Sequence, residues 1–207
     1  KLKKCIVISG FLLLPALLMS QGLLINTQNR VTTSLNGLWN YITDPYETGY
    51  YSFHSEIYDQ KNPSSPSAFY NNYHQKNKAE LVEYDFDKSS VLQVPGDWNT
   101  QKENLFYYEG TIWYKRSFDF NLKENNRLFV YFGGVNYKAE VYLNGIKLGT
   151  HEGGFTSFNY EVTSVVKQKK HYFSLLLSPN GKEKNKIRHH RFILQPDTIG
   201  RLCLGAG

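Results

Sequence analysis

The sequence predicts an all-β protein that folds as a β-sandwich. Short segments rich in β-branched and aromatic residues recur along the chain, turn signals follow them, and no convincing long amphipathic helix is present. Aromatic residues make up 15% of the 207 residues, and they suit the pleated, half-buried surface of a sheet better than a helix. Hydrophobic residues make up 41%, so we expect one domain with a substantial core.

The first expected strand is an aromatic run within residues 35–41, next to a turn at Asn36-Gly37. Residues 43–80 are rich in Tyr, Asn, Ser and Pro and keep no period of 2 or 3.6, so we expect a long surface excursion there. Residues 91–94 then form a strand that ends at Pro95-Gly96, because this pair favours a turn.

Two further strands are expected at residues 111–118 and 127–132, which are aromatic and β-branched. Residues 138–143 alternate, so that Ala139, Val141 and Leu143 face inward and the residues between them face outward.

Asn144-Gly145 predicts a hairpin after that strand, because a type I′ turn needs positive φ at both central positions. Residues 146–148 would then return along the preceding strand. Segments 158–162 and 171–177 complete the predicted set of strands.

The formal charge of +6 does not indicate a nucleic-acid-binding protein. Three of the excess positive charges lie at Lys1, Lys3 and Lys4, and four lie from Lys182 onward, which leaves residues 22–181 with a charge of −1. No basic face therefore spans the folded part, and we expect no nucleic-acid partner.

Residues 1–21 are typical of a secretory signal peptide. Three lysines precede a mostly apolar run at 5–19, which is shorter than the roughly 20 residues of a membrane-spanning helix. Cleavage after Ser20 or nearby would leave an exported domain, so we expect a periplasmic or extracellular location and no membrane span after cleavage. An uncleaved anchor and a buried strand are the alternatives. Only Cys5 and Cys203 occur, so residues 22–181 hold no disulfide framework and no thiol metal site.

Few residues form a recognisable catalytic pattern. Asp97 and Glu109 are the best candidates for a pair of catalytic carboxylates, which would have to lie about 5–10 Å apart. A structural role fits them better, because Asp97 follows Pro-Gly in a turn and Glu109 precedes a glycine. None of the six histidines has a metal-binding spacing, and no phosphate loop or nucleophile elbow is present. The sequence predicts no catalytic residue, no metal and no cofactor.

Aromatic side chains in loops are the other candidates, because sugars present C–H faces that stack on aromatic rings. Trp98, Tyr107, Tyr108 and Phe155 lie in or beside expected loops. Most aromatic residues of a sandwich belong to its core, so for these four we favour a structural role over ligand contact.

Five segments in fixed order resemble glycoside hydrolase family 2, which includes β-galactosidases, β-glucuronidases and β-mannosidases. The resemblance covers roughly residues 30–180 and is to the family's N-terminal sugar-binding domain, a galactose-binding-like jelly roll, in the variety closest to secreted enzymes of gut-type bacteria. The segments are Leu35-Asn36-Gly37-Leu38-Trp39, Val94-Pro95-Gly96-Asp97-Trp98, Tyr108-Glu109-Gly110-Thr111-Ile112-Trp113-Tyr114, Val135-Asn136-Tyr137-Lys138-Ala139-Glu140-Val141-Tyr142-Leu143-Asn144-Gly145 and Gly153-Gly154-Phe155-Thr156-Ser157-Phe158.

The resemblance implies a β-linked glycan or glycoside as ligand. In this family an immunoglobulin-like domain and a (β/α)₈ barrel follow the sandwich, and the barrel carries two glutamates, one of them after an Asn. The 207 residues contain no Asn-Glu pair and no room for a barrel of about 250 residues. No catalytic residue is carried over, and we expect this polypeptide not to hydrolyse aryl β-glycosides. The residues that we expect to contact a substrate are Asp97, Trp98, Tyr108 and Glu109.

Residues 182–207 depart from the family pattern and do not align with it. Their composition and charge change abruptly, so we expect an out-of-frame or truncated tail and a sandwich that lacks its last strand. The expected organisation is a signal peptide at 1–21, a sugar-binding sandwich at 22–181 and this tail.

Three functions follow from these features. The first is the N-terminal sugar-binding domain of a secreted retaining exo-β-glycosidase, whose sandwich loops shape the sugar pocket. The second is a stand-alone carbohydrate-binding module. The third is a non-catalytic interaction domain that keeps only the fold.

Overall fold

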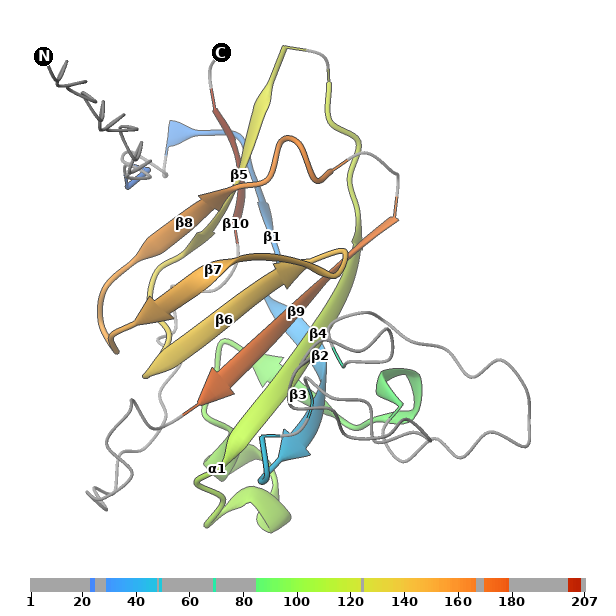
Figure 1. Cartoon of the computed structure of the whole chain (residues 1–207), viewed down its shortest axis with the longest axis vertical. Coiled ribbons are helices and arrows are strands. Elements are labelled where there is room, and N and C mark those ends of the chain that lie inside the picture. The colour runs from blue at the N-terminus through green and yellow to red at the C-terminus, as the bar shows by residue number, and fades with distance from the viewer. Residues whose placement is uncertain are drawn as a thin grey trace, which may run out of the picture.

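The computed structural model describes residues 23–24, 29–47, 49, 69, 85–123, 125–166, 170–178 and 201–205. These residues form two antiparallel sheets that make the two layers of a β-sandwich (Figure 1). One sheet has six strands in the order β3-β2-β4-β9-β6-β7, and the other has four in the order β1-β10-β5-β8. The predicted all-β sandwich is confirmed.

The sequence order of the elements places most neighbours in the sheets far apart along the chain. The elements are β1 (Thr32–Ser34), β2 (Gly37–Asp44), η3 (Phe86–Lys88), β3 (Val91–Val94), α1 (Trp98–Gln101), η4 (Glu103–Leu105), β4 (Thr111–Asp119), β5 (Arg127–Phe132), β6 (Lys138–Leu143), β7 (Ile146–Glu152), β8 (Phe158–Glu161), β9 (Lys170–Ser178) and β10 (Arg201–Gly205).

The main core lies between the two sheets. Alternate residues of each strand point into it, which is the period of 2 that a strand imposes. The predicted inward residues Ala139, Val141 and Leu143 of β6 are completely buried there. They belong to the same cluster as Leu128 and Val130 of β5 in the opposite sheet.

The predicted hairpin between β6 and β7 is confirmed. Asn144 and Gly145 have φ angles of 51° and 79°, the positive values that a type I′ turn requires. The Asn144 side chain also serves β9, because its Oδ1 accepts a hydrogen bond of 3.1 Å from the Tyr172 amide. The turn is therefore fixed to the neighbouring strand as well as to its own hairpin.

The outer face of the six-stranded sheet carries a second, smaller cluster of buried residues. The rings of Trp113 on β4 and Tyr142 on β6 lie 5.9 Å apart, and Phe69 packs edge-on against Trp113 at 5.8 Å. Tyr142 and Glu140, which the alternation of β6 places on this outward side, are therefore buried although they do not face the main core. The cluster comprises Ile42, Phe69, Phe86, Trp113, Tyr142 and Leu176.

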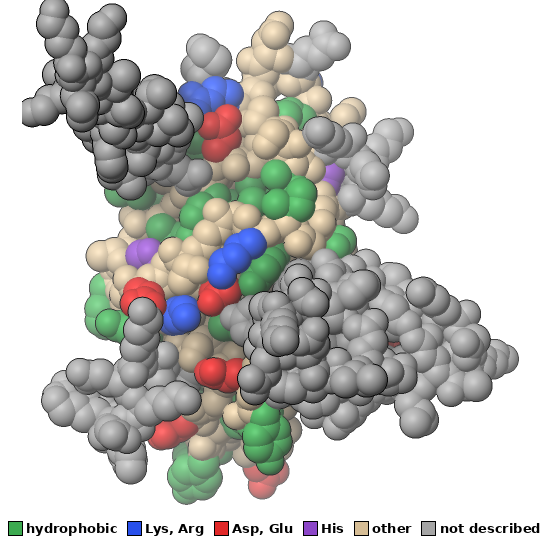
Figure 2. Space-filling model, in the orientation of Figure 1, with side chains coloured by type: hydrophobic (Ala, Val, Ile, Leu, Met, Phe, Trp, Pro, Cys, Tyr) green, Lys and Arg blue, Asp and Glu red, His purple; other side chains and the backbone are tan. Residues whose placement is uncertain are grey.

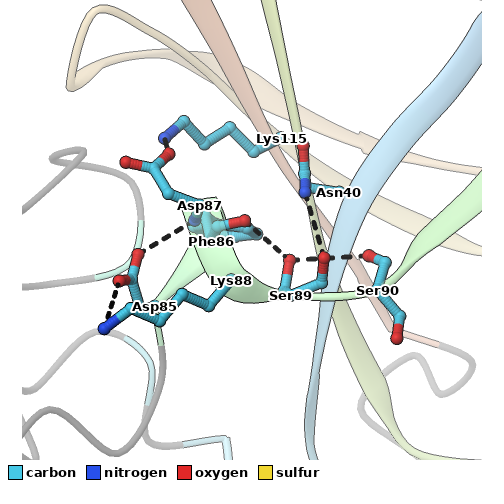
Figure 3. Close-up of polar contacts among 8 residues, drawn as sticks. All are labelled: Asn40, Asp85, Phe86, Asp87, Lys88, Ser89, Ser90 and Lys115. Atoms are coloured by element: carbon cyan, nitrogen blue, oxygen red, sulfur yellow. Dashed lines mark hydrogen bonds and ion pairs between the residues drawn. The ribbon is translucent and has the colours of Figure 1, made fainter.

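Polar contacts fasten η3 to the same outer face (Figure 3). Asp85 caps η3 by accepting a hydrogen bond of 2.9 Å from the Asp87 amide. Lys115 of β4 extends along the sheet to Asp87, with 3.3 Å between Nζ and Oδ1, and its ammonium lies 5.6 Å from the centre of the Phe86 ring. The Lys115 side chain is 7% exposed and that of Asp87 is 56% exposed, so the ion pair joins a buried lysine to a carboxylate at the surface.

The expectation of a missing last strand is wrong. β10 lies between β1 and β5 and pairs with both, so residues 201–205 fill a place in the middle of the four-stranded sheet. The charge and composition of residues 182–207 as a whole do not reveal β10, because a strand of five residues needs only a short extended segment next to another strand. Residues 179–200, the predicted signal peptide and most of the predicted excursion at 43–80 lie outside the described residues. Within the described part, no helix is long and apolar enough to cross a membrane.

Candidate functional site

Polar residues line one end of the six-stranded sheet. The strand register places Asp44 of β2 opposite Thr111 of β4, and Lys138 of β6 opposite both Ser178 of β9 and Glu152 of β7. The connections that meet at this end are the turn after β2, the segment between β3 and β4, and the loops between β5 and β6 and between β7 and β8 (Figure 1). We call these connections the loop end: residues 45–47, 97–110, 133–137 and 153–157.

Side-chain hydrogen bonds hold the longest of these connections, residues 97–110. Asp97 caps α1 by accepting a bond of 3.0 Å from the Asn99 amide, the role that Asp favours before a helix. Asn99 Nδ2 then lies 2.6 Å from the Leu105 carbonyl oxygen and 3.1 Å from that of Tyr108. One amide group therefore closes the loop between α1 and β4.

Trp98 is completely buried in the main core, with an exposed fraction of 0%. Its indole Nε1 donates a hydrogen bond of 3.2 Å to the Tyr108 carbonyl. Neither face of the ring is open to a glycan, so the substrate contact expected for Trp98 is corrected to a packing role. The sequence placed it in a loop, but the first turn of α1 directs an apolar ring inward, where its burial is favourable.

Tyr108 and Glu109 lie together just before β4. Tyr108 is half-buried, and its hydroxyl donates a bond of 2.7 Å to the Thr111 carbonyl. A Cβ on Gly110 would come within 2.4 Å of that hydroxyl, so glycine lets the ring fold back over the chain. Glu109 is exposed, and the neighbouring Thr111 hydroxyl donates to Glu47 Oε1 at 3.2 Å.

The charge of Asp97 acts on the core beside it. Burial raises the pKa of Tyr114 far above its usual value of 10, and the charges of Asp97 and Tyr41 raise it further. Tyr114 is therefore a neutral phenol at physiological pH. The half-buried Asp97 carboxylate thus lies next to the core while it caps α1.

The loops 133–137 and 153–157 form the other half of the loop end. The Gly153 amide donates a bond of 2.8 Å to the Tyr137 carbonyl. Phe155 is 81% exposed and Tyr137 42% exposed. The sequence analysis named Phe155 as an aromatic residue of a loop, but not Tyr137. Tyr137 lies next to the loop 153–157 because Lys138 pairs with Glu152, and this pairing becomes known only from the structure.

A second exposed aromatic pair lies on the segment 97–110. Phe106 and Tyr107 are 57% and 89% exposed, and their rings meet edge to face at 4.7 Å. Figure 2 shows hydrophobic side chains at the surface of this lower end of the molecule. The sequence named Tyr107 and missed Phe106.

The loop end offers hydroxyl, carboxylate and aromatic groups suited to holding a sugar. Among the described residues, no three His, Cys, Asp or Glu side chains lie close enough to hold a metal ion. Of the four predicted contact residues on the loop end, Asp97, Tyr108 and Glu109 are at least partly exposed. The side chain of Trp98 is buried in the main core.

Residues 82–201 match the family model for the glycosyl hydrolase 2 galactose-binding domain-like fold. The chain belongs to this family. The match covers β3 to the first residue of β10 and therefore includes three of the four connections of the loop end.

Known relatives agree with this assignment. A protein of Formosa agariphila assigned as a β-glucuronidase is 28% identical over 151 residues, which is 66% of this chain and 14% of that protein. A β-galactosidase of Thermoanaerobacter pseudethanolicus is 30% identical over 94 residues, which is 42% of this chain and 13% of that enzyme. The chain thus spans about a seventh of the length of these curated relatives.

Solved structures show the same fold. The β-glucuronidase of an uncultured Clostridium species matches with a TM-score of 0.57 at 21% identity, over 88% of this chain and 30% of that one. The domain is therefore a galactose-binding-like sandwich of the kind found in β-glucuronidase-like glycosidases of glycoside hydrolase family 2.

Proposed function

We propose that this domain is the sugar-recognition domain of a retaining exo-β-glycosidase, and that its loop end forms one wall of the pocket for a β-linked glycoside. The observation that carries the proposal is the family match over residues 82–201, which includes the segment 97–110. The named relatives are β-glucuronidases and a β-galactosidase, so the expected ligand class is a β-linked hexopyranoside.

The contact residues that we propose are Asp97, Tyr108 and Glu109. Glu109 is exposed, and Tyr108 is held beside it by its bond to the Thr111 carbonyl. The Asp97 carboxylate is held by its bond from the Asn99 amide. A carboxylate and a ring that are already held in place suit recognition, because little side-chain entropy is lost when the ligand binds. These residues bind and orient a ligand, and the two carboxylates of the double displacement are not assigned to this chain.

The test is a titration of the 207-residue chain with methyl β-D-glucuronide and with methyl β-D-galactopyranoside, followed by backbone amide chemical shifts. We expect shifts confined to the loop end and a Kd on the order of 1 mM, because one wall of a pocket offers few contacts. Glu109→Gln should weaken binding, whereas Glu103→Gln, an exposed glutamate on η4, should not. No shift with either glycoside would overturn the proposal.

The strength of binding separates this proposal from the stand-alone module. A domain that binds glycans by itself needs a complete site, so its Kd would lie nearer ~1 μM than ~1 mM. Micromolar binding with no dependence on Glu109 would favour the module.

We also propose that the protein is exported. The support is the sequence pattern at residues 1–21, where lysines precede a short apolar run. Fractionation of expressing cells tests this. Protein that begins near Gln21 in the periplasm or the medium would support export, and uncleaved protein in the cytoplasm would contradict it.

A further inference from the structure

Two loops of the loop end are locked to each other where β6 and β7 meet. The Gly153 amide donates to the Tyr137 carbonyl at 2.8 Å. Gly153 has a φ of 139°, which other residues rarely adopt. A Cβ on Gly154 would lie 3.0 Å from Asn136 Oδ1, so the Asn136 side chain packs tightly against the Gly154 backbone. The loops 133–137 and 153–157 therefore act as one unit.

This unit holds two aromatic side chains at the surface. Phe155 is 81% exposed and Tyr137 is 42% exposed. A Cβ on Gly134 would lie 4.0 Å from the Phe155 Cα, which shows that the Phe155 backbone packs directly on the loop that carries Tyr137. Large apolar rings are usually buried, so two exposed rings on a tightly fixed turn suggest a ligand rather than a packing role.

Polar residues follow both aromatic residues in the chain. Thr156 comes directly after Phe155, and its Oγ1 lies 3.1 Å from His151 Nε2. Lys138 comes directly after Tyr137, and its Nζ lies 3.5 Å from Glu140 Oε1. A hydroxyl and an ammonium next to exposed aromatic residues suit a sugar, whose C–H face is apolar and whose edge is polar.

We propose that Phe155 and Tyr137 form an aromatic platform that stacks on the pyranose ring of a β-linked hexopyranoside, with Thr156 and Lys138 at its polar rim. This inference rests on the proposed function and adds a contact surface that does not depend on Asp97, Tyr108 or Glu109.

The test compares four variants of the 207-residue chain in the same glycoside titration. Phe155→Ala and Tyr137→Ala should each weaken binding by about tenfold, the usual effect of removing an aromatic anchor. Phe155→Trp keeps a stacking surface and should bind within about threefold of the unsubstituted chain. Ile146→Ala is the control, because it removes an exposed apolar side chain at the opposite end of the β6–β7 hairpin, and it should leave binding unchanged. Unfolding midpoints of all variants check that the fold is kept.

The two glycosides test which part of the ligand each side chain contacts. The apolar C–H face is common to both, so the losses in Phe155→Ala and Tyr137→Ala should be equal for the galactoside and the glucuronide. Lys138→Gln should weaken only the glucuronide, because only that ligand has a carboxylate for the ammonium to attract.

Each remaining outcome has a definite meaning. If the chain binds, and Phe155→Ala binds as well as the unsubstituted chain, the platform is wrong while the proposed function stands. If the unsubstituted chain binds neither glycoside, both are wrong. Losses in Ile146→Ala equal to those in Phe155→Ala would also overturn the platform, because they would indicate a general effect of removing exposed apolar side chains.

Discussion

The indole Nε1 of Trp98 donates a hydrogen bond of 3.2 Å to the backbone carbonyl of Tyr108. The same carbonyl oxygen accepts a second bond of 3.1 Å, from Asn99 Nδ2. A carbonyl oxygen has two lone pairs, and here both are used. At this carbonyl, the loop that carries the proposed contact residues is thus attached both to the Asn99 side chain of α1 and to the buried ring of Trp98.

Asn99→Ala should destabilise the domain by about 1 kcal/mol, because it removes the hydrogen bonds that the side-chain amide donates to carbonyls of the loop. The carbonyls concerned belong to Leu105, Phe106 and Tyr108, at 2.6, 3.3 and 3.1 Å from Nδ2. Urea unfolding measures the loss. Asn104→Ala, at an exposed position in η4, is the control and should change the free energy of unfolding by less than about 0.5 kcal/mol. Equal effects of the two substitutions would contradict the role of Asn99.

Asn144 contributes to stability in two separable ways. Its φ of 51° suits the hairpin turn, and its side chain bonds the Tyr172 amide at 3.1 Å and His171 Nδ1 at 3.2 Å. Asn144→Gly keeps the backbone geometry and loses only these bonds. Asn144→Ala loses both and should be less stable than Asn144→Gly by about 1 kcal/mol. Thermal unfolding of the pair separates the two contributions, and equal melting temperatures would show that the turn geometry has little effect.

Local signals in the sequence were enough for strands β2 to β9 and for the hairpin, but not for β1 and β10. Alternation in residues 138–143 and the Asn-Gly pair depend on neighbours within a few residues, so they can be interpreted without knowledge of the fold. Trp98 could not be assigned in this way, because the direction of its ring depends on how α1 packs across the end of the sandwich. Tyr137 and β10 were missed for a related reason. Their positions follow from pairing with Gly153 and β5, which are distant in the sequence.

The ion pair between Arg127 and Glu161 should make stability depend on pH in the acid range. Arg127 Nη2 lies 2.6 Å from Glu161 Oε2, and Nε lies 3.1 Å from Oε1. The hydrogen bond from Arg127 is the main cause that lowers the pKa of Glu161 from its usual value of 4.5. A carboxylate with a lowered pKa stabilises the fold above its unfolded pKa, and this contribution is lost as the pH falls below about 4.5.

Glu161→Gln tests this contribution, because the amide cannot titrate. Unfolding free energies measured from pH 6 down to pH 3 should fall less steeply for Glu161→Gln than for the unsubstituted chain. The difference should be small, since solvent reaches both side chains, which are 53% and 35% exposed. Parallel curves for Glu161→Gln and the unsubstituted chain would contradict the assignment.

His151 should give a second pH dependence, at higher pH and of a different origin. Burial lowers the pKa of His151 from 6.5, and a backbone hydrogen bond with Gly153 only partly opposes this effect. The unfolded chain therefore takes up a proton at a higher pH than the folded domain, so the fold loses stability as the pH falls through and below about 6.5. His151→Phe keeps a ring to stack on Phe158, 4.0 Å away, and cannot titrate. The unfolding free energy of this variant should change less between pH 7.5 and pH 5 than that of the unsubstituted chain.

Thr156→Val keeps the imidazole and removes only its hydroxyl partner, so it should retain the pH dependence. If His151→Phe and Thr156→Val have the same slope, the dependence arises elsewhere. Because Glu161 acts only at lower pH, the two contributions can be measured in one series of unfolding curves.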